Sequence, residues 1–287
     1  MQSLTRHLAI SLLLLHSWSS QAATAVTLGN DVWSPYVEAD GQHGLAIEIV
    51  RAALQQQQRM LTVQIKPWAR AYRDVQSCNN DLTLVWYEAS RLHEIRYSAP
   101  FLTNRLRFIK RLDDSFEYQD LARLAGKSIG VIRGYNYQNE FINNPSYHLS
   151  ANHSLSANLQ MLALKRIDLV VEDELVAATT IFQQRMEGQF IFTGPALDER
   201  KLYVATGTCN AEGEALIDSF NQGLTAIRAN GEYQQLVDKY RAILQSRKSP
   251  VDINTIFPAL RNPPFKAPLI PQQLAWWQAT PASPYLR

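Results

Sequence analysis

One short stretch of the sequence places a charge where α/β proteins commonly bind ligands. The segment ASRLHEIRYSAPF (89–101) follows DLTLVWY, an apolar and β-branched run that predicts a buried strand. Residues just beyond a strand end often contact ligands in α/β folds, and the guanidinium of Arg91 offers two parallel donors to a carboxylate. Most arginines are solvated surface charges, so a role for Arg91 depends on the rest of the chain.

The sequence contains no familiar catalytic or metal-binding motif. The segment LAGKSIG (124–130) includes GKS, but Leu121 stands where a phosphate loop needs its first glycine, and the predicted strand follows the motif instead of preceding it. No GxSxG, CxxC or HExxH occurs, and the six histidines are scattered along the chain. We therefore expect no catalytic residue, no metal and no cofactor.

The N-terminus predicts export. Arg6 precedes the apolar run 8–15, and small residues such as Ala22 and Ala25 follow it. This arrangement is typical of a secretory signal peptide, and the apolar run is too short to form a membrane-spanning anchor. We predict that residues 1–25 form the signal peptide, with cleavage near residue 22 or 25.

The balance of charges does not indicate a polyanionic partner. The chain has 28 lysine and arginine residues against 26 acidic residues, for a formal net charge of +2. Nucleic acids and anionic membranes attract strongly basic proteins, so this balance gives no argument for either, and we expect no nucleic acid partner.

Two cysteines, Cys78 and Cys209, lie far apart in the sequence. An even number of cysteines in an exported chain favours one disulfide. Two free thiols are the alternative, because the sequence by itself does not show that the two side chains are close.

Predicted strands and helices alternate along most of the chain. Apolar helix positions such as Leu216, Phe220 and Leu224 recur at helical spacing, and this alternation predicts parallel sheets covered by helices. Eight of the thirteen prolines lie between Pro250 and Pro284, which predicts a proline-rich C-terminal tail over 248–287. The strands are expected at 26–30, 61–66, 82–87, 106–110, 128–132, 167–171, 190–192 and 201–206.

Several motifs, each weak alone, follow one another in a specific order. They are DVWSPY, GLAIEIVRA, RLHEIRYSAPF, LAGKSIGVIRGYN, KRIDLVVEDELVA and RANGEYQQLVDKY, spread from about residue 26 to residue 241. In their order and spacing the chain resembles the family 3 extracellular solute-binding proteins, the amino-acid-binding class of periplasmic receptors. The resemblance implies a type II periplasmic-binding-protein-like α/β fold, in which two α/β lobes joined by two crossover strands close on a ligand.

The same resemblance implies a division of the chain into lobes. Lobe 1 is expected to be discontinuous, over 26–111 and 202–247, and lobe 2 to cover 112–201 with the crossovers at its ends. Cys78 and Cys209 both fall in loops of lobe 1 on this plan, so we predict a Cys78–Cys209 disulfide.

The matching positions imply a set of ligand contacts. Arg91 matches the arginine that takes the α-carboxylate of the ligand, and Asp173 matches the acid that holds its α-ammonium group. Asn136 matches a position near a helix start that also meets the carboxylate. Trp33 and Trp68 match the positions that flank the ligand side chain, although ordinary core packing is an equal alternative for Trp68.

The chain departs from the family pattern beside these positions. Leu84, Trp86 and Glu88 occupy a region where relatives usually carry serine, threonine or glycine, and Tyr135 replaces a small residue. We therefore add Trp86, Glu88 and Tyr135 to the predicted ligand-binding residues and expect a crowded, aromatic cleft. Glu88 would repel a carboxylate or recruit a second cationic group. An amino acid is the first expectation, with an amine, a modified amino acid or another small acid as alternatives.

These expectations define a periplasmic solute-binding receptor that captures a small zwitterionic or carboxylate ligand for transport or sensing. Its partners would be that small molecule and either the permease of an ABC transporter or a sensor, and we expect a monomer. Two alternatives stay open. One is a dehydratase-like enzyme on the same scaffold, and the other is a pseudo-receptor that binds a protein partner.

Overall fold

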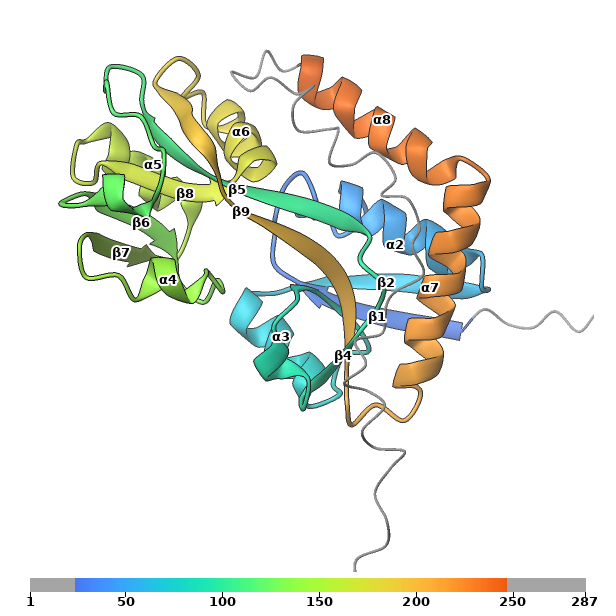
Figure 1. The fold of residues 1–287 in the computed structure, drawn as a ribbon. Coiled ribbons are helices and arrows are strands. Elements are labelled where there is room, and N and C mark those ends of the chain that lie inside the picture. Colours follow the sequence, from blue (N-terminus) through green and yellow to red (C-terminus); the bar gives the residue numbers. More distant parts are fainter. Residues whose placement is uncertain (1–23, 247–287) are drawn as a thin grey trace, which may run out of the picture.

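The computed structural model describes residues 24–246 (Figure 1). The predicted signal peptide and the proline-rich tail therefore lie outside the described residues, apart from positions 24 and 25. The elements, in chain order, are β1 (Thr24–Asn30), α2 (Leu45–Gln55), β2 (Arg59–Ile65), α3 (Trp68–Gln76), β3 (Thr83–Trp86), η1 (Ala89–Arg91), β4 (Ile95–Tyr97), β5 (Leu102–Arg111), η2 (Leu121–Leu124), β6 (Ser128–Ile132), α4 (Asn139–Ile142), β7 (His148–Asn152), α5 (Leu155–Ala163), β8 (Leu169–Asp173), α6 (Glu174–Gln183), β9 (Phe190–Gly207), α7 (Gly213–Ala229) and α8 (Glu232–Ser246).

Two α/β lobes lie side by side, as the resemblance predicts (Figure 1). One lobe contains β1 to β4 with α2, α3, α7 and α8, and the other contains β6 to β8 with α4, α5 and α6. The long strands β5 and β9 run from one lobe into the other. Strand pairing does not by itself fix a boundary within β5 or β9, so the residue ranges given above for the two lobes stay predictions.

The strand directions correct one expectation. β1 pairs with β2 in parallel, and β6 pairs in parallel with β7 and β8, as strand–helix alternation predicts. β5 is antiparallel to both β8 and β9, and β3 is antiparallel to β9, so the expectation of purely parallel sheets is wrong. Helical crossovers impose parallel neighbours only within a lobe. β9 instead returns the chain to the first lobe and runs beside β5, the strand that leads from the first lobe into the second. The strands predicted at 190–192 and 201–206 are both parts of β9.

The helices that cover the first lobe follow their apolar spacing. Leu45, Ile49 and Leu54 of α2 are fully buried, and α2 packs against α7, whose Phe220 and Ile227 are also fully buried. Apolar side chains at helical spacing lie along one side of a helix, and burial is most favourable when that side faces the core. Within residues 24–246, no helix is both long enough and apolar enough to cross a membrane.

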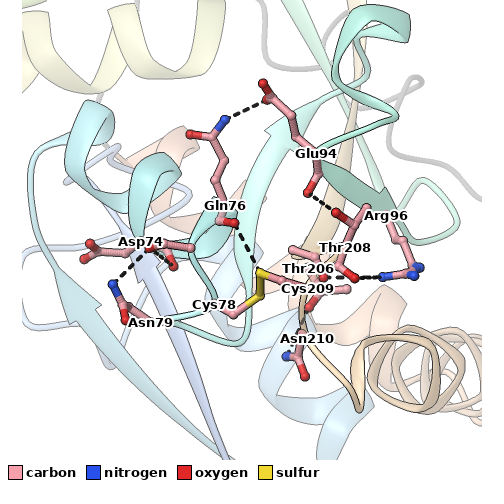
Figure 2. Close-up of a disulfide and its surroundings, with 12 residues drawn as sticks. Asp74, Gln76, Cys78, Asn79, Glu94, Arg96, Thr206, Thr208, Cys209 and Asn210 are labelled. Carbon is pink, nitrogen blue, oxygen red and sulfur yellow. Dashed lines mark hydrogen bonds between the residues drawn. A yellow bond between two sulfur atoms is a disulfide. The ribbon is translucent and has the colours of Figure 1, made fainter.

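Cys78 and Cys209 form the predicted disulfide, which joins the turn after α3 to the end of β9 across 131 residues of sequence (Figure 2). The backbone of β9 comes very close to this turn at Gly207. A Cβ atom there would lie 2.2 Å from the carbonyl oxygen of Val75 and 2.9 Å from Sγ of Cys78, so only glycine fits. The disulfide thus holds the C-terminal end of α3 against the sheet.

Candidate functional site

Three of the predicted residues form an aromatic wall that crosses from one lobe to the other. The ring centroids of Trp33 and Trp86, both from the first lobe, lie 6.0 Å apart. Tyr135, from the loop after β6 in the second lobe, lies 5.3 Å from Trp86 in an edge-to-face arrangement. Aromatic pairs of this geometry contribute about 0.5–1.5 kcal/mol beyond their buried area, so the wall favours contact between the lobes.

Asp173 lies at the junction of β8 and α6 and caps the helix. Its Oδ1 accepts hydrogen bonds from the backbone N–H groups of Leu175 and Val176, both at 3.0 Å. These bonds satisfy two of the N–H groups that a helix start leaves without partners. Burial raises the pKa of the Asp173 carboxyl to about 6, although its hydrogen bonds oppose that shift.

The second oxygen of Asp173 is bound by side chains from distant parts of the chain. Asn104, on β5, donates from Nδ2 to Oδ2 at 3.1 Å, and the hydroxyl of Tyr36 donates to the same oxygen at 3.3 Å. The Oδ1 of Asn104 in turn accepts a bond from Nε1 of Trp86 at 2.8 Å. A continuous polar chain therefore links the aromatic wall to the start of α6.

The loop that carries Trp33 and Tyr36 is fixed against the start of α2. The backbone N–H groups of Leu45 and Ala46 donate to the carbonyl oxygens of Pro35 and Tyr36 at 2.8 and 3.1 Å. Gly44 makes this close approach feasible, because it has φ 121° and a Cβ atom there would lie 2.3 Å from the carbonyl oxygen of Tyr36. The sequence interpretation did not include Tyr36.

Arg91 lies in η1 and belongs to a second group of side chains. Its guanidinium carbon lies 4.6 Å from the centre of the Tyr72 ring, and the Tyr72 hydroxyl donates to Oε2 of Glu94 at 2.7 Å. No carboxylate among residues 24–243 lies within ion-pair distance of Arg91. The Tyr72 ring supports the guanidinium of Arg91 from one side. Within residues 24–243, the N–H donors of that guanidinium have no acidic partner.

Trp68 lies between Tyr72, which contacts Arg91, and the second lobe. It is half-buried, its ring centroid is 5.8 Å from that of Tyr72, and its backbone N–H donates to Oδ2 of Asp31 at 3.2 Å. Its Cδ1 is 3.8 Å from the position that a Cβ atom would take on Gly134. The N-terminal end of α3 thus faces the loop after β6, which carries Gly134 and Tyr135.

The two remaining predicted residues lie on the same two sides. Asn136 is half-buried in the loop that follows β6, and α4 begins at Asn139, so Asn136 precedes the helix by three positions. Glu88 is half-buried beside η1, and its backbone N–H and carbonyl both lie 3.2 Å from the hydroxyl of Tyr97. The roles assigned to Asn136 and Glu88 stay predictions.

Sequence interpretation missed Glu172, which precedes Asp173. The Glu172 side chain is 1% exposed, and its Oε1 accepts a 2.8 Å hydrogen bond from the backbone N–H of Asp173. Burial is the main cause that raises the pKa of its carboxyl to about 8. A second acid directly before Asp173, at the end of the apolar run LVV, was the available signal, because carboxylates are rarely buried without a reason.

The family of the chain follows from comparison with known proteins. The sequence model of the bacterial extracellular solute-binding proteins, family 3, matches residues 27–243. The chain belongs to this family.

Curated relatives match over part of their length. The histidine-binding periplasmic protein of Salmonella typhimurium is 29% identical over 125 residues, covering 42% of this chain and 48% of the relative. The L-arginine-binding protein of Pseudomonas aeruginosa is 27% identical over 156 residues, covering 52% of this chain and 60% of the relative. The chain therefore spans about half the length of these relatives.

Solved structures share the fold at low identity. An ancestral arginine-binding protein bound to arginine has a TM-score of 0.66 at 18% identity and covers 76% of this chain and 98% of its own. A histidine kinase sensor domain with similarity to periplasmic binding proteins has a TM-score of 0.67 at 20% identity, covering 75% of this chain and 95% of its own. Both confirm the predicted two-lobed α/β architecture.

Proposed function

We propose that this protein is a periplasmic receptor that captures an amino acid, or a small amine-bearing derivative of one, between its two lobes. The observation that carries the proposal is the contrast between the two sides of the site. Arg91 presents a guanidinium without an acidic partner among the described residues, and the end of β8 presents buried carboxyls at Glu172 and Asp173. A zwitterionic ligand would place its carboxylate at Arg91 and its ammonium group at these carboxyls.

The carboxylate end of the ligand pairs with Arg91. A guanidinium fits a carboxylate through two parallel N–H···O bonds and stays charged at any physiological pH. Tyr72 holds it in place through ring contact, and the disulfide holds α3, which carries Tyr72. The two lobes close when one ligand bridges Arg91 in the first lobe and the acids of the second.

A second unpaired donor supports a polar ligand at the aromatic wall. The Nε1 of Trp33 is buried and has no hydrogen-bond acceptor among the described residues. Leaving such a group unpaired costs about 1–3 kcal/mol, so an acceptor atom of a bound ligand would recover part of that cost. Trp33 is therefore a contact for the ligand as well as part of the wall.

The names of the matched relatives indicate the class of ligand and the setting. They are named for histidine, for arginine, or for lysine, arginine and ornithine, and six of these seven relatives are called periplasmic. We propose binding without catalysis, export with cleavage of the leader near residue 22 or 25, and delivery of the ligand to a membrane transporter. A sensor is the alternative partner, favoured by the shared fold of the kinase sensor domain.

Calorimetric titration of Arg91→Ala tests this function. The wild-type protein is first screened by thermal shift against L-amino acids, amines and small organic acids. For a ligand that carries a carboxylate, loss of one partner from a desolvated charge pair costs about 2–5 kcal/mol, which corresponds to a roughly 30-fold to several thousand-fold loss of affinity. Arg91→Lys should restore only part of it, because an ammonium group does not reproduce the planar fork.

Arg73→Ala is the matched control, because Arg73 is an exposed arginine on α3 that directly follows Tyr72 in the sequence. It should bind like the wild type. If Arg91→Ala folds and binds within about threefold of the wild type, under about 1 kcal/mol, the proposed carboxylate contact is wrong.

A further inference from the structure

Glu172 is a buried acid with no cation to pair with in the described part of the protein. It is 1% exposed, its one hydrogen bond comes from the backbone N–H of Asp173, and no basic side chain of residues 24–243 lies within ion-pair distance. Glu174, equally buried, is different, because Arg105 and Arg107 approach its carboxylate at 3.1 and 3.5 Å. Buried acids are normally paired in this way, so the missing cation of Glu172 needs an explanation.

Asp173, in contrast, has no acceptor capacity left. Its carboxylate already receives four hydrogen bonds, from Leu175, Val176, Asn104 and Tyr36. A carboxylate offers about four lone-pair sites, so an ammonium group could bind Asp173 only by displacing one of these donors. Two of the four are backbone groups of a helix start, and Asn104 is fully buried and tied to Trp86.

Glu172 lies at the carboxyl end of β8, and this end of a strand is where α/β proteins commonly bind ligands. Its charge raises the pKa values of Tyr135 and Tyr137, in both cases after burial, which places both rings within its electrostatic range. Tyr135 is part of the aromatic wall through its contact with Trp86. The unpaired carboxyl therefore lies beside Asp173 at the end of β8, in the lobe that also carries Tyr135.

We propose that Glu172 is the carboxylate that receives the cationic amine of the ligand, and that Asp173 is a positioning residue that fixes the start of α6 and the hydroxyl of Tyr36. This inference rests on the proposed function, because it requires an amine-bearing ligand. It changes the assignment that the sequence resemblance suggested, in which Asp173 held that group.

The assignment has a consequence for protons. In the free protein the pKa of Glu172 is about 8, so at pH 7 its carboxyl is mostly protonated. The titratable groups beside it are Asp173, Tyr135 and Tyr137. Arg107 lies opposite Glu172 in the β5–β8 register, but its guanidinium contacts Glu174 and the carbonyl oxygen of Gly194. A bound ammonium group favours the ionised form, so binding releases the carboxyl proton to solvent and leaves an ammonium–carboxylate pair. Affinity should therefore rise as the pH increases from about 6 to 8 and then level off.

The experiment compares Glu172→Gln with Asp173→Asn in the full-length exported protein. The probe is whichever of L-arginine, L-histidine, L-lysine and L-glutamine binds the wild type most tightly by calorimetry. Titrations at pH 7 in two buffers with different ionisation enthalpies count the protons released. We expect release of close to one proton by the wild type, none by Glu172→Gln, and at least a 30-fold loss of affinity for Glu172→Gln. Asp173→Asn should lose less affinity than Glu172→Gln and should retain proton release.

The inference is overturned if Glu172→Gln binds within threefold of the wild type, or if the wild type releases no proton. It also fails, together with the proposed function, if none of the four probes binds the wild type. Failure of the inference alone is recognisable, because Arg91→Ala would still lower the affinity about 30-fold or more while Glu172→Gln would not. Thermal unfolding of each variant shows that it is folded, and glutamine preserves the shape of Glu172 without its charge.

Discussion

Removal of the Cys78–Cys209 disulfide should destabilise the protein strongly. The perturbation is the double variant Cys78→Ser and Cys209→Ser, which leaves no unpaired thiol. The bridge joins residues 131 positions apart, and the chain-entropy relation gives about 5 kcal/mol for a loop of that length. Measured values commonly fall below this limit, so we expect a loss of roughly 3–5 kcal/mol in the free energy of unfolding.

The disulfide should also affect the site, because it anchors α3. Gln76, in the last turn of α3, donates to Glu94 (Figure 2). Glu94 also accepts from Tyr72, whose ring supports Arg91. Release of this end of the helix gives Tyr72 more freedom. We therefore expect a several-fold loss of ligand affinity in the double variant, smaller than that of Arg91→Ala.

Urea unfolding followed by tryptophan fluorescence measures the effect, with the slope of the transition fitted separately for each protein. A loss of 3–5 kcal/mol should lower the melting temperature by roughly 6–20 °C in a protein of this size. The reduced wild type should unfold like the double variant, and reductant should not change the double variant. A loss below about 1 kcal/mol with an unchanged slope would refute the reasoning, because the bridge would then constrain the unfolded chain very little.

Two further predictions concern the polar network and the leader. Asn104→Ala should lower the free energy of unfolding, measured with urea, by about 2–4 kcal/mol, because it leaves Nε1 of Trp86 without its acceptor and removes one hydrogen-bond donor from Asp173. A loss under about 1 kcal/mol would contradict this prediction and would mean that water replaces the amide. Asn104→Asp keeps the acceptor but faces Asp173 with a second carboxyl, so its defect should be larger at pH 8 than at pH 5. Mass spectrometry of the exported protein should find an N-terminus at Ala23 or Val26, and retention of Met1 would contradict the predicted processing.

The sequence by itself determined the local elements and the family. Apolar spacing indicated α2 and α7, alternating and β-branched runs indicated most strands, and the ordered motifs predicted the two-lobed fold. It also selected Trp33, Trp86 and Tyr135, which the structure brings into contact. These features are available from sequence because each depends on residues within one or two turns, or on motifs whose spacing is visible in the chain.

Only the tertiary structure decided which charged groups have partners. Asp173 and Glu172 are neighbours in the sequence, yet the two donors to Oδ2 of Asp173 are Asn104 and Tyr36, which are 69 and 137 positions away. The same holds for β5 and β9, whose antiparallel pairing joins segments separated by a whole lobe. Acceptor capacity and burial are properties of the packed surroundings, so no local pattern in VVEDEL could show that Asp173 is fully bonded and that Glu172 has no cation.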